Sequence, residues 1–369
     1  MLNQRIALVH DWLNTRRGGE RVVAVLHTMF PDAPIYTSIV DPNELWPELI
    51  RADIRPSWMQ TLPGLKKHFR KYLMLYPKAF ESFDLSEYDI IISTSSAFAK
   101  GIKTSKRSVH ICYCFTPMRF VWDYDNYIQR EQFGKCIRSV LPYFIKYLKK
   151  WDLKTINRPD EYIAISSVVA DRIKRIYKRD ASIIFPPVNV ERFQCIDHNE
   201  DFYLVVSQLV PYKRIDLAVK AFNELGLPLI IAGDGHDRPA LEAMAKSNIT
   251  FLGKITDEKL RKYYGLCRAL IFPGTEDFGI TPLEANAAGR PVIAYKAGGA
   301  LDTVIEGLNG IFFLSQTPEA LIDAVHRQQT ILWDKEKIRE HAYKYSVSNF
   351  KCKFTEFIEK TVNERYLSS

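Results

Sequence analysis

The chain has 369 residues, of which 47% are hydrophobic and 25% charged, and its formal net charge is +8. This composition is typical of a packed globular protein, excludes a low-complexity or fibrous chain, and the length suffices for two domains. No apolar run approaches the roughly 20 residues that span a bilayer, and the first residues, MLNQRIALVHDW, indicate a strand rather than a signal peptide.

Strands alternate with helices in the first half of the chain. The patterns predict a glycine loop at 16–19 and helices at 20–30 and 168–177. Strands are expected at 5–12, 89–96, 108–115, 161–167 and 181–187. A polar, proline-bearing stretch at 186–201 is the best candidate for a linker between domains.

The second half repeats this alternation. Helices are expected at 214–225, 239–247 and 257–267, and strands at 202–209, 228–235, 249–255, 269–274 and 291–295. Strands that alternate with helices form parallel sheets covered on both faces. The sequence therefore predicts two Rossmann-like domains, each with its binding site at the carboxyl ends of the strands.

The stretch TEDFGITPLEANAAGRPVIA (275–294) holds two glutamates, Glu276 and Glu284. Thr281 is a suitable N-cap and Pro282 a suitable first residue for a short helix that ends at Gly289. Glu276 would then lie in a loop and Glu284 in the first helical turn, on either side of backbone N–H groups that attract anions. A nucleotide sugar has the matching layout of ribose, diphosphate and hexose.

The net positive charge of the chain comes from its first half. Residues 1–195 hold 30 Lys and Arg against 20 Asp and Glu, whereas residues 196–369 hold 21 against 23. Two stretches, 58–77 with Lys66, Lys67, Arg70 and Lys71, and 141–154 with Lys146, Lys149 and Lys150, place these cations among bulky apolar residues. Such segments can lie on an anionic membrane surface, although a packed helix with solvated lysines gives the same pattern. No nucleic-acid-binding motif accompanies the charge.

Five segments carry a resemblance: GGERV, CYCFTPMRFVWD, VVSQLVPYKRIDLAV, FLGKITDEKL and GTEDFGITPLEANAAGRPVIAYKAGGALDTVIEG. In this order and spacing, they resemble the family-4 retaining glycosyltransferases of GT-B fold. The resemblance covers about residues 5 to 325, and within the family it points to bacterial mannosyltransferases that build O-antigen and other lipid-linked polysaccharides. It implies two Rossmann-like domains whose parallel sheets face each other across a cleft. The expected boundaries are 1–190 for an acceptor domain and 197–346 for a nucleotide-sugar domain, with a final helix at 347–369 that packs back on the first.

The resemblance assigns roles to residues of the second domain. Glu276 would contact hydroxyls of the donor sugar and Glu284 the ribose, while Lys213 would bind the diphosphate and stabilise the leaving group. Arg214 is the neighbouring cation. Backbone donors to the diphosphate and sugar would come from Phe278, Gly279 and Ile280.

Other residues complete the expected site. Gly18 and Gly19 would form a turn over the phosphates, although an ordinary strand-to-helix turn explains them as well. The backbone of Lys254 and Ile255 would meet the base. Asp11 is expected to act at the acceptor cleft, in preference to its neighbour His10, for which a plain structural hydrogen bond is the more common role.

The chain departs from the family pattern at two positions. Gln208 stands where the family usually has Arg, so a charge-assisted contact with the diphosphate is lost. Phe115 stands where relatives more often have His, which touches the transferred sugar. Phe115 and Arg119 are the candidates to face the acceptor or the sugar, with solvent as the default for Arg119.

The expected function is transfer of a hexose, mannose from GDP-mannose, with retention of configuration to a lipid-linked saccharide. The enzyme would work at the cytoplasmic face of the membrane as a peripheral protein, without a metal ion or other cofactor and without nucleic acid. A UDP-sugar-dependent transferase of the same fold is one alternative. An epimerase of nucleotide sugars and a non-catalytic nucleotide-sugar binder are the others.

Overall fold

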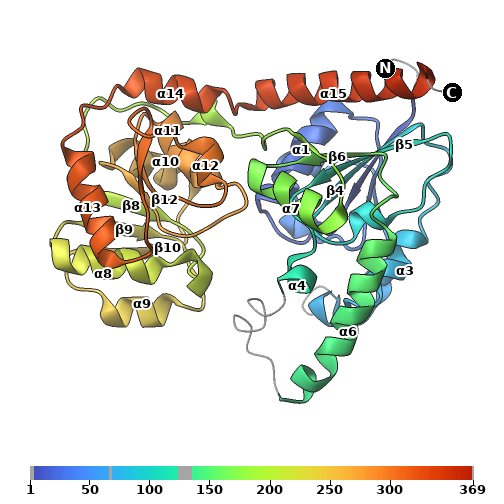
Figure 1. Cartoon of the computed structure of the whole chain (residues 1–369), viewed down its shortest axis with the longest axis horizontal. Helices are drawn as coiled ribbons and strands as arrows, with labels where there is room; N and C mark the ends of the chain where they lie inside the picture. The colour runs from blue at the N-terminus through green and yellow to red at the C-terminus, as the bar shows by residue number, and fades with distance from the viewer. Residues whose placement is uncertain (1–3, 66–68, 124–134, 368–369) are drawn as a thin grey trace. The chain divides into compact units, whose positions relative to one another are not determined.

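A computed structural model describes residues 4–65, 69–123 and 135–367. The chain divides into two compact units, Met1–Pro187 with Phe350–Ser369, and Val188–Asn349. We call the first of these unit 1 and the second unit 2. In each unit, helices flank a central sheet (Figure 1). Lys66 and Lys67, part of the first basic stretch, lie outside the described residues.

The described strands of unit 1 form one parallel sheet in the order β3-β2-β1-β4-β5-β6-β7. The central strands β4 and β5 are buried along their lengths, as expected for a sheet covered on both faces, although β4 ends in Ser-Thr-Ser and β5 contains a histidine. The bounds are β1 Ile6–His10, β2 Ile35–Thr37, β3 Ile54–Pro56, β4 Ile90–Ser95, β5 Val109–Cys114, β6 Glu161–Ala164 and β7 Ser182–Ile183.

Helices of unit 1 cover this sheet, and the last one comes from the end of the chain (Figure 1). Their bounds are α1 Gly18–Met29, α3 Tyr76–Glu81, α4 Arg119–Trp122, α6 Lys135–Lys154, α7 Ser167–Tyr177 and α15 Val347–Leu367. On α15, Phe350 and Phe354 pack against Tyr113 of β5, with ring centroids 5.9 Å apart in both pairs. The C-terminal helix is thus fixed to unit 1 by buried aromatic contacts.

Unit 2 has a second parallel sheet, in the order β10-β9-β8-β11-β12-β13. Its strands are β8 Tyr203–Val206, β9 Leu229–Ala232, β10 Ile249–Gly253, β11 Leu270–Phe272, β12 Val292–Tyr295 and β13 Gly310–Phe313. Its helices are α8 Ile215–Leu225, α9 Arg238–Met244, α10 Asp257–Leu266, α11 Ile280–Ala287, α12 Ala300–Thr303, α13 Pro318–Gln329 and α14 Lys335–Tyr343.

Local sequence signals explain where several helices begin and end. The side chains of Thr256, Thr317 and Asp334 accept hydrogen bonds from backbone N–H groups at the starts of α10, α13 and α14. Gly226 ends α8 in a left-handed conformation. Short 3-10 turns connect other elements: η1 Pro42–Glu44, η2 Pro47–Leu49, η3 Trp58–Thr61, η4 Phe69–Tyr72, η5 Ala99–Gly101, η6 Val190–Arg192 and η7 Pro211–Lys213.

Two helix starts differ from the expectation. Helix α1 begins at Gly18, so the glycine pair forms its first turn rather than a preceding loop. Helix α11 begins at Ile280 with Gly279 as its N-cap, so Thr281 is not the cap. Glycine fits this N-cap because its φ is +85°, and a Cβ there would lie 2.8 Å from the Phe272 ring.

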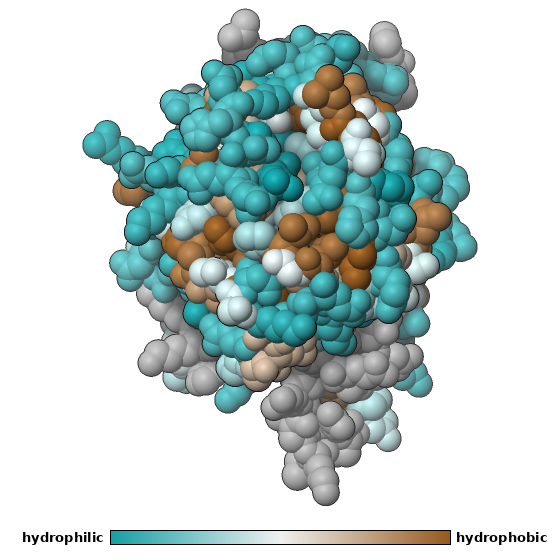
Figure 2. All heavy atoms as spheres, turned by 90° about the vertical axis from the view of Figure 1, so that its left-hand side faces the viewer, coloured by the Kyte–Doolittle hydropathy of each residue, from teal (hydrophilic) through white to brown (hydrophobic). Residues whose placement is uncertain are grey.

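Figure 2 views the molecule from the side on which α8, α9 and α13 lie in Figure 1. Hydrophilic residues dominate this face, and hydrophobic ones gather near its middle. Among the described residues, no helix combines the length and the apolar character that crossing a bilayer requires.

Candidate functional site

Each sheet reverses its strand order at one place. In unit 1 the reversal lies between β1 and β4, and in unit 2 between β8 and β11. In open parallel sheets, ligands bind outside the carboxyl ends of the strands at such a reversal, because the helices leave it in opposite directions. Topology thus points to one candidate site in each unit.

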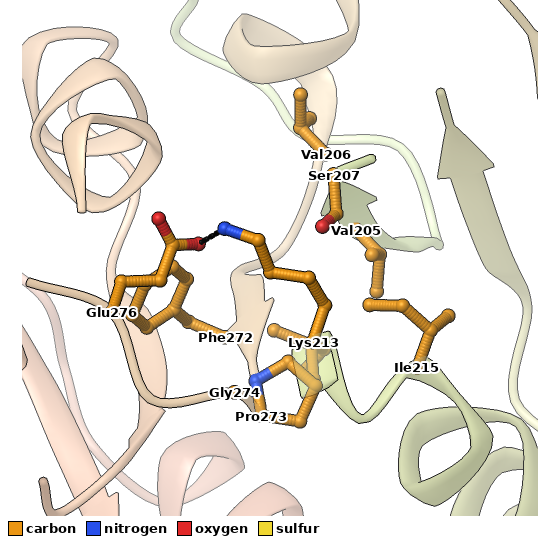
Figure 3. Close-up of a pocket in the computed structure, with 10 residues that line it drawn as sticks. Val205, Val206, Ser207, Lys213, Ile215, Phe272, Pro273, Gly274 and Glu276 are labelled. Carbon is orange, nitrogen blue, oxygen red and sulfur yellow. Dashed lines mark ion pairs between the residues drawn. The ribbon is translucent and has the colours of Figure 1, made fainter. Parts of the chain in front are cut away.

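A small cavity marks this place in unit 2. Its volume is about 10 Å³, which is room for about one water molecule. Figure 3 shows the side chains of Lys213, from η7, and Glu276, from the loop after β11, pointing toward one another and joined as an ion pair. Their side chains are 14% and 26% exposed, so a ligand can reach both. The lining residues are Val205, Val206, Ser207, Lys213, Ile215, Ile271, Phe272, Pro273, Gly274 and Glu276.

The backbone that carries Glu276 is held by a second loop. Gly299 N–H donates to the carbonyl oxygen of Glu276 over 2.8 Å. A Cβ on Gly299 would lie 2.2 to 2.5 Å from backbone atoms of Phe278, a distance that real contacts do not reach. The segment KAGGA (296–300) therefore needs glycine at this position so that the loop with Glu276 can pack closely against it.

The start of α11 follows directly after this loop. Phe278 is buried and its ring lies 6.1 Å from that of Tyr345, so its side chain is committed to the core. Gly279 and Ile280 follow it and place their backbone N–H groups at the start of α11. N–H groups in the first turn of a helix have no intrahelical acceptor, and they favour an anion.

Glu284 has a different environment, four residues into α11. Its carboxylate accepts a hydrogen bond from Arg192 Nη2 at 2.7 Å and one from the hydroxyl of Tyr264 at 2.8 Å. Arg192 also pairs with Asp257 at 3.3 Å. Burial raises the pKa of Tyr264 well above its usual range, so this hydroxyl stays a donor. Arg192 and Tyr264 thus fix the orientation of Glu284, and neither was expected from the sequence because both are distant from it along the chain.

The other candidates of unit 2 are more scattered. Arg214 has a left-handed backbone and directs its guanidinium to Asp216 and Gln316, each at 3.1 Å. Its side chain is therefore engaged elsewhere. Gln208 is exposed after β8, and Lys254 is exposed and Ile255 half-buried in the loop after β10.

In unit 1, Asp11 lies at the strand reversal but is 1% exposed. Its two oxygens accept hydrogen bonds from Ser96 N–H and Oγ and from the N–H groups of Ala97, Phe98 and Ala99, at 2.6 to 3.0 Å. A carboxylate with this many donors holds the turn after β4 in place. The structure gives Asp11 a supporting position, with its oxygens occupied by the protein itself.

Three other residues of unit 1 come together above β1. A Cβ on Gly19 would lie 3.5 Å from the Phe115 ring and 3.9 Å from the His10 ring. His10 and Phe115 meet edge to face with centroids 6.3 Å apart. Gly18 is exposed in the same first turn of α1, and half-buried Arg119 begins α4. The sequence signal for His10 is its place next to Asp11 near the end of the first expected strand.

Among the described residues, no three or more His, Cys, Asp or Glu side chains lie together so that they could hold a metal ion.

The second half of the chain is similar to a known protein family. Residues 189–366 match the model of glycosyl transferases group 1. An uncharacterised glycosyltransferase of Methanocaldococcus jannaschii is 26% identical over 216 residues, 55% of this chain and 58% of that protein. The O-antigen chain mannosyltransferase C of Escherichia coli is 27% identical over 164 residues, 41% of this chain and 43% of that protein. The chain thus spans about half the length of these curated relatives.

Solved structures match over almost the whole chain. Anabaena HepE in complex with UDP superposes with a TM-score of 0.71 at 16% identity and covers 96% of this chain and 100% of its own. At this identity the likeness shows the fold alone, which is GT-B, with two parallel-sheet Rossmann-like domains. The segment that matches the group 1 glycosyl transferases, residues 189–366, contains Lys213, Glu276 and Glu284.

Proposed function

We propose that the chain is a retaining glycosyltransferase that transfers mannose from GDP-mannose to a lipid-linked saccharide. The observation that carries this proposal is the Lys213–Glu276 ion pair at the strand reversal of unit 2, next to the start of α11. It combines a cation and the N–H groups of a helix start for a diphosphate with a carboxylate for sugar hydroxyls. Few other ligands need all three groups at one strand reversal.

The roles follow from the chemistry of each group. The ammonium of Lys213 and the N–H groups at Gly279 and Ile280 bind the diphosphate and stabilise the charge that develops on it as the leaving group. Glu276 accepts hydrogen bonds from the sugar, and Glu284, oriented by Arg192, accepts them from the ribose. The leaving diphosphate assists deprotonation of the acceptor, so the protein contributes mainly positioning and charge stabilisation.

The choice of donor rests on the relatives. The Escherichia coli relative is named a mannosyltransferase, which supports mannose. A UDP-sugar donor is the second candidate, because the HepE structure that shares this fold contains UDP. Lys213 supplies positive charge to the diphosphate directly, which supports our proposal that no metal ion is required.

A lipid-linked acceptor fits the surface of α6. Tyr143, Phe144 and Tyr147 are 76%, 42% and 47% exposed, and Lys146 and Lys150 are exposed beside them. Aromatic rings and lysines on one exposed stretch favour the interface of an anionic bilayer. We therefore propose peripheral membrane contact through α6, and the variant Lys146→Gln/Lys150→Gln should bind less to vesicles that contain phosphatidylglycerol. Equal binding of the variant and the native chain would contradict this contact.

A thermal-shift panel tests the donor. GDP, UDP, ADP and their sugar conjugates are added one at a time, once in EDTA and once with Mg²⁺. The proposal predicts the largest increase in melting temperature with GDP and GDP-mannose, and the same increase in EDTA. An increase with UDP alone would replace the donor, and no increase with any nucleotide would contradict the proposed function.

A further inference from the structure

His10 occupies the strand reversal of unit 1. It is the last residue of β1, is 4% exposed, and pairs in register with Thr94 of the neighbouring strand β4. A polar side chain buried to this degree needs partners for its nitrogen atoms, because an unpaired polar atom in the interior is costly. The partners of the two ring nitrogens therefore show how this imidazole is used.

The hydrogen bonds around Thr94 determine where the imidazole carries its proton. The Thr94 hydroxyl donates to the carbonyl oxygen of Val9 at 3.2 Å, and His10 Nδ1 lies 2.7 Å from the same hydroxyl oxygen. A hydroxyl has one proton to donate. Since that proton goes to Val9, the hydroxyl accepts from His10, and Nδ1 carries the hydrogen. In neutral His10 the other nitrogen, Nε2, therefore presents a lone pair.

This lone pair is not used by the protein. Among the described residues, His10 Nε2 has no hydrogen-bond partner, and it is not one of the side-chain atoms that are fully enclosed without one. The ring edge next to Nε2 faces Gly19. Because glycine has no side chain, the volume that a side chain would fill at this position is open. The edge-to-face contact with Phe115 fixes the ring from another side.

We propose that His10 Nε2 accepts a hydrogen bond from a hydroxyl of the sugar substrate, in a subsite formed with Gly19 and Phe115. This inference rests on the proposed function, which supplies the sugar. A lone pair attracts an O–H donor and repels a phosphate oxygen, so the subsite selects a neutral hydroxyl group. The Phe115 ring offers an apolar surface to the C–H groups of a pyranose.

Two substitutions separate this role from a structural one. In His10→Asn the amide nitrogen takes the place of Nδ1 and keeps the bond to Thr94, but the distal acceptor is lost. In His10→Gln the amide reaches the position of Nε2 and restores an acceptor there. Nitrogen-15 NMR of the labelled full chain reports the tautomer directly, with the His10 signals assigned by their loss in His10→Gln.

The native chain should show a protonated Nδ1 and an unprotonated Nε2. With GDP present, methyl α-mannoside should shift the Nε2 signal if the acceptor sugar occupies the subsite, and GDP-mannose should shift it beyond the effect of GDP if the donor sugar does. The affinity for that sugar should fall roughly three- to tenfold in His10→Asn, the effect of one hydrogen bond, and recover in part in His10→Gln.

Two results would exclude this role of His10. One is a protonated Nε2, and the other is an Nε2 signal that neither methyl α-mannoside nor GDP-mannose shifts. GDP binding is the internal control, because it depends on unit 2. If GDP does not bind to the native chain, the proposed function fails. If GDP binds equally to the native chain and His10→Asn while the sugar affinities do not differ, only the role of His10 fails.

Discussion

Lys213 and Glu276 form an ion pair where β8 and β11 end, with both side chains largely shielded from water. In this arrangement each charge neutralises the other. A bound diphosphate would compete with Glu276 for the ammonium and release the carboxylate toward the sugar. Nucleotide binding at Lys213 can therefore free the Glu276 carboxylate to bind the donor sugar.

The substitution Glu276→Gln should separate transfer from nucleotide binding. It removes the negative charge and replaces one of the two acceptor oxygens with an amide donor. We therefore expect the kcat/KM of transfer to fall by roughly 100-fold, as for the loss of one transition-state contact. GDP affinity should stay equal or rise, because Lys213 loses its competing partner. Steady-state kinetics and calorimetry with GDP measure the two effects.

Glu306 provides a control for this change. It is an exposed glutamate of the same unit that pairs with Arg327, and Glu306→Gln should leave both quantities unchanged. A clearly weaker binding of GDP to Glu276→Gln would argue against competition for Lys213.

Gly299→Ala should disturb the loop that carries Glu276. The added Cβ would meet the backbone of Phe278 at 2.2 Å, and the loop must shift to relieve this contact. We expect a loss of transfer activity together with a lower melting temperature. Gly226→Ala is the matched control, since nothing lies within 4 Å of the added Cβ and the strain there comes only from its positive φ. Full activity in Gly299→Ala would show that the loop tolerates the shift.

Asp11→Asn tests whether this carboxylate supports the fold. The amide cannot accept from all of the donors at residues 96–99, and hydrogen bonds to a charged group contribute about 1.5–3 kcal/mol each. The free energy of unfolding in urea should therefore fall by at least about 2 kcal/mol. A variant of unchanged stability that has lost transfer would instead indicate a direct role in catalysis.

Acid should destabilise unit 1 through His110. Burial, with the Lys100 and Arg158 charges nearby, lowers the pKa of His110 from 6.5 to about 3. Between these values the unfolded chain binds a proton that the native chain does not, so stability is present above pH 6.5 and is lost as the pH falls toward 3. The fall in stability should be less steep in His110→Gln. Equal slopes in urea unfolding between pH 6.5 and 4 would contradict this pKa.

The architecture could be predicted from local patterns, and the confirmed part is the pair of parallel, Rossmann-like sheets. Apolar runs such as those of β4 and β5 mark buried parallel strands whatever the rest of the chain does. The sequence predicts a later start for α11, because Thr281 and Pro282 are good helix-start residues. In the structure the N-cap is Gly279, where glycine is required by a positive φ and by the nearby Phe272 ring. Neither requirement can be read from local sequence.

The supporting residues of the candidate sites could not be predicted for a related reason. Arg192 precedes its partner Glu284 by 92 residues, and Asp11 accepts from a turn 85 to 88 residues away. Contacts at this separation depend on how the strands are ordered. Asp11 and His10 illustrate this, because they are adjacent at one strand end and yet their polar atoms have different partners.

The most direct test of the central claim is calorimetric titration of GDP into the native chain and Lys213→Met, with guanosine as the second ligand. Lys220→Met, an exposed lysine of α8, is the control. If Lys213 binds the diphosphate, GDP affinity should fall at least about tenfold in Lys213→Met, as for a lost charge-assisted contact, while guanosine affinity stays the same. Equal loss of GDP and guanosine binding, or no loss of either, would contradict a diphosphate site at the Lys213–Glu276 pair.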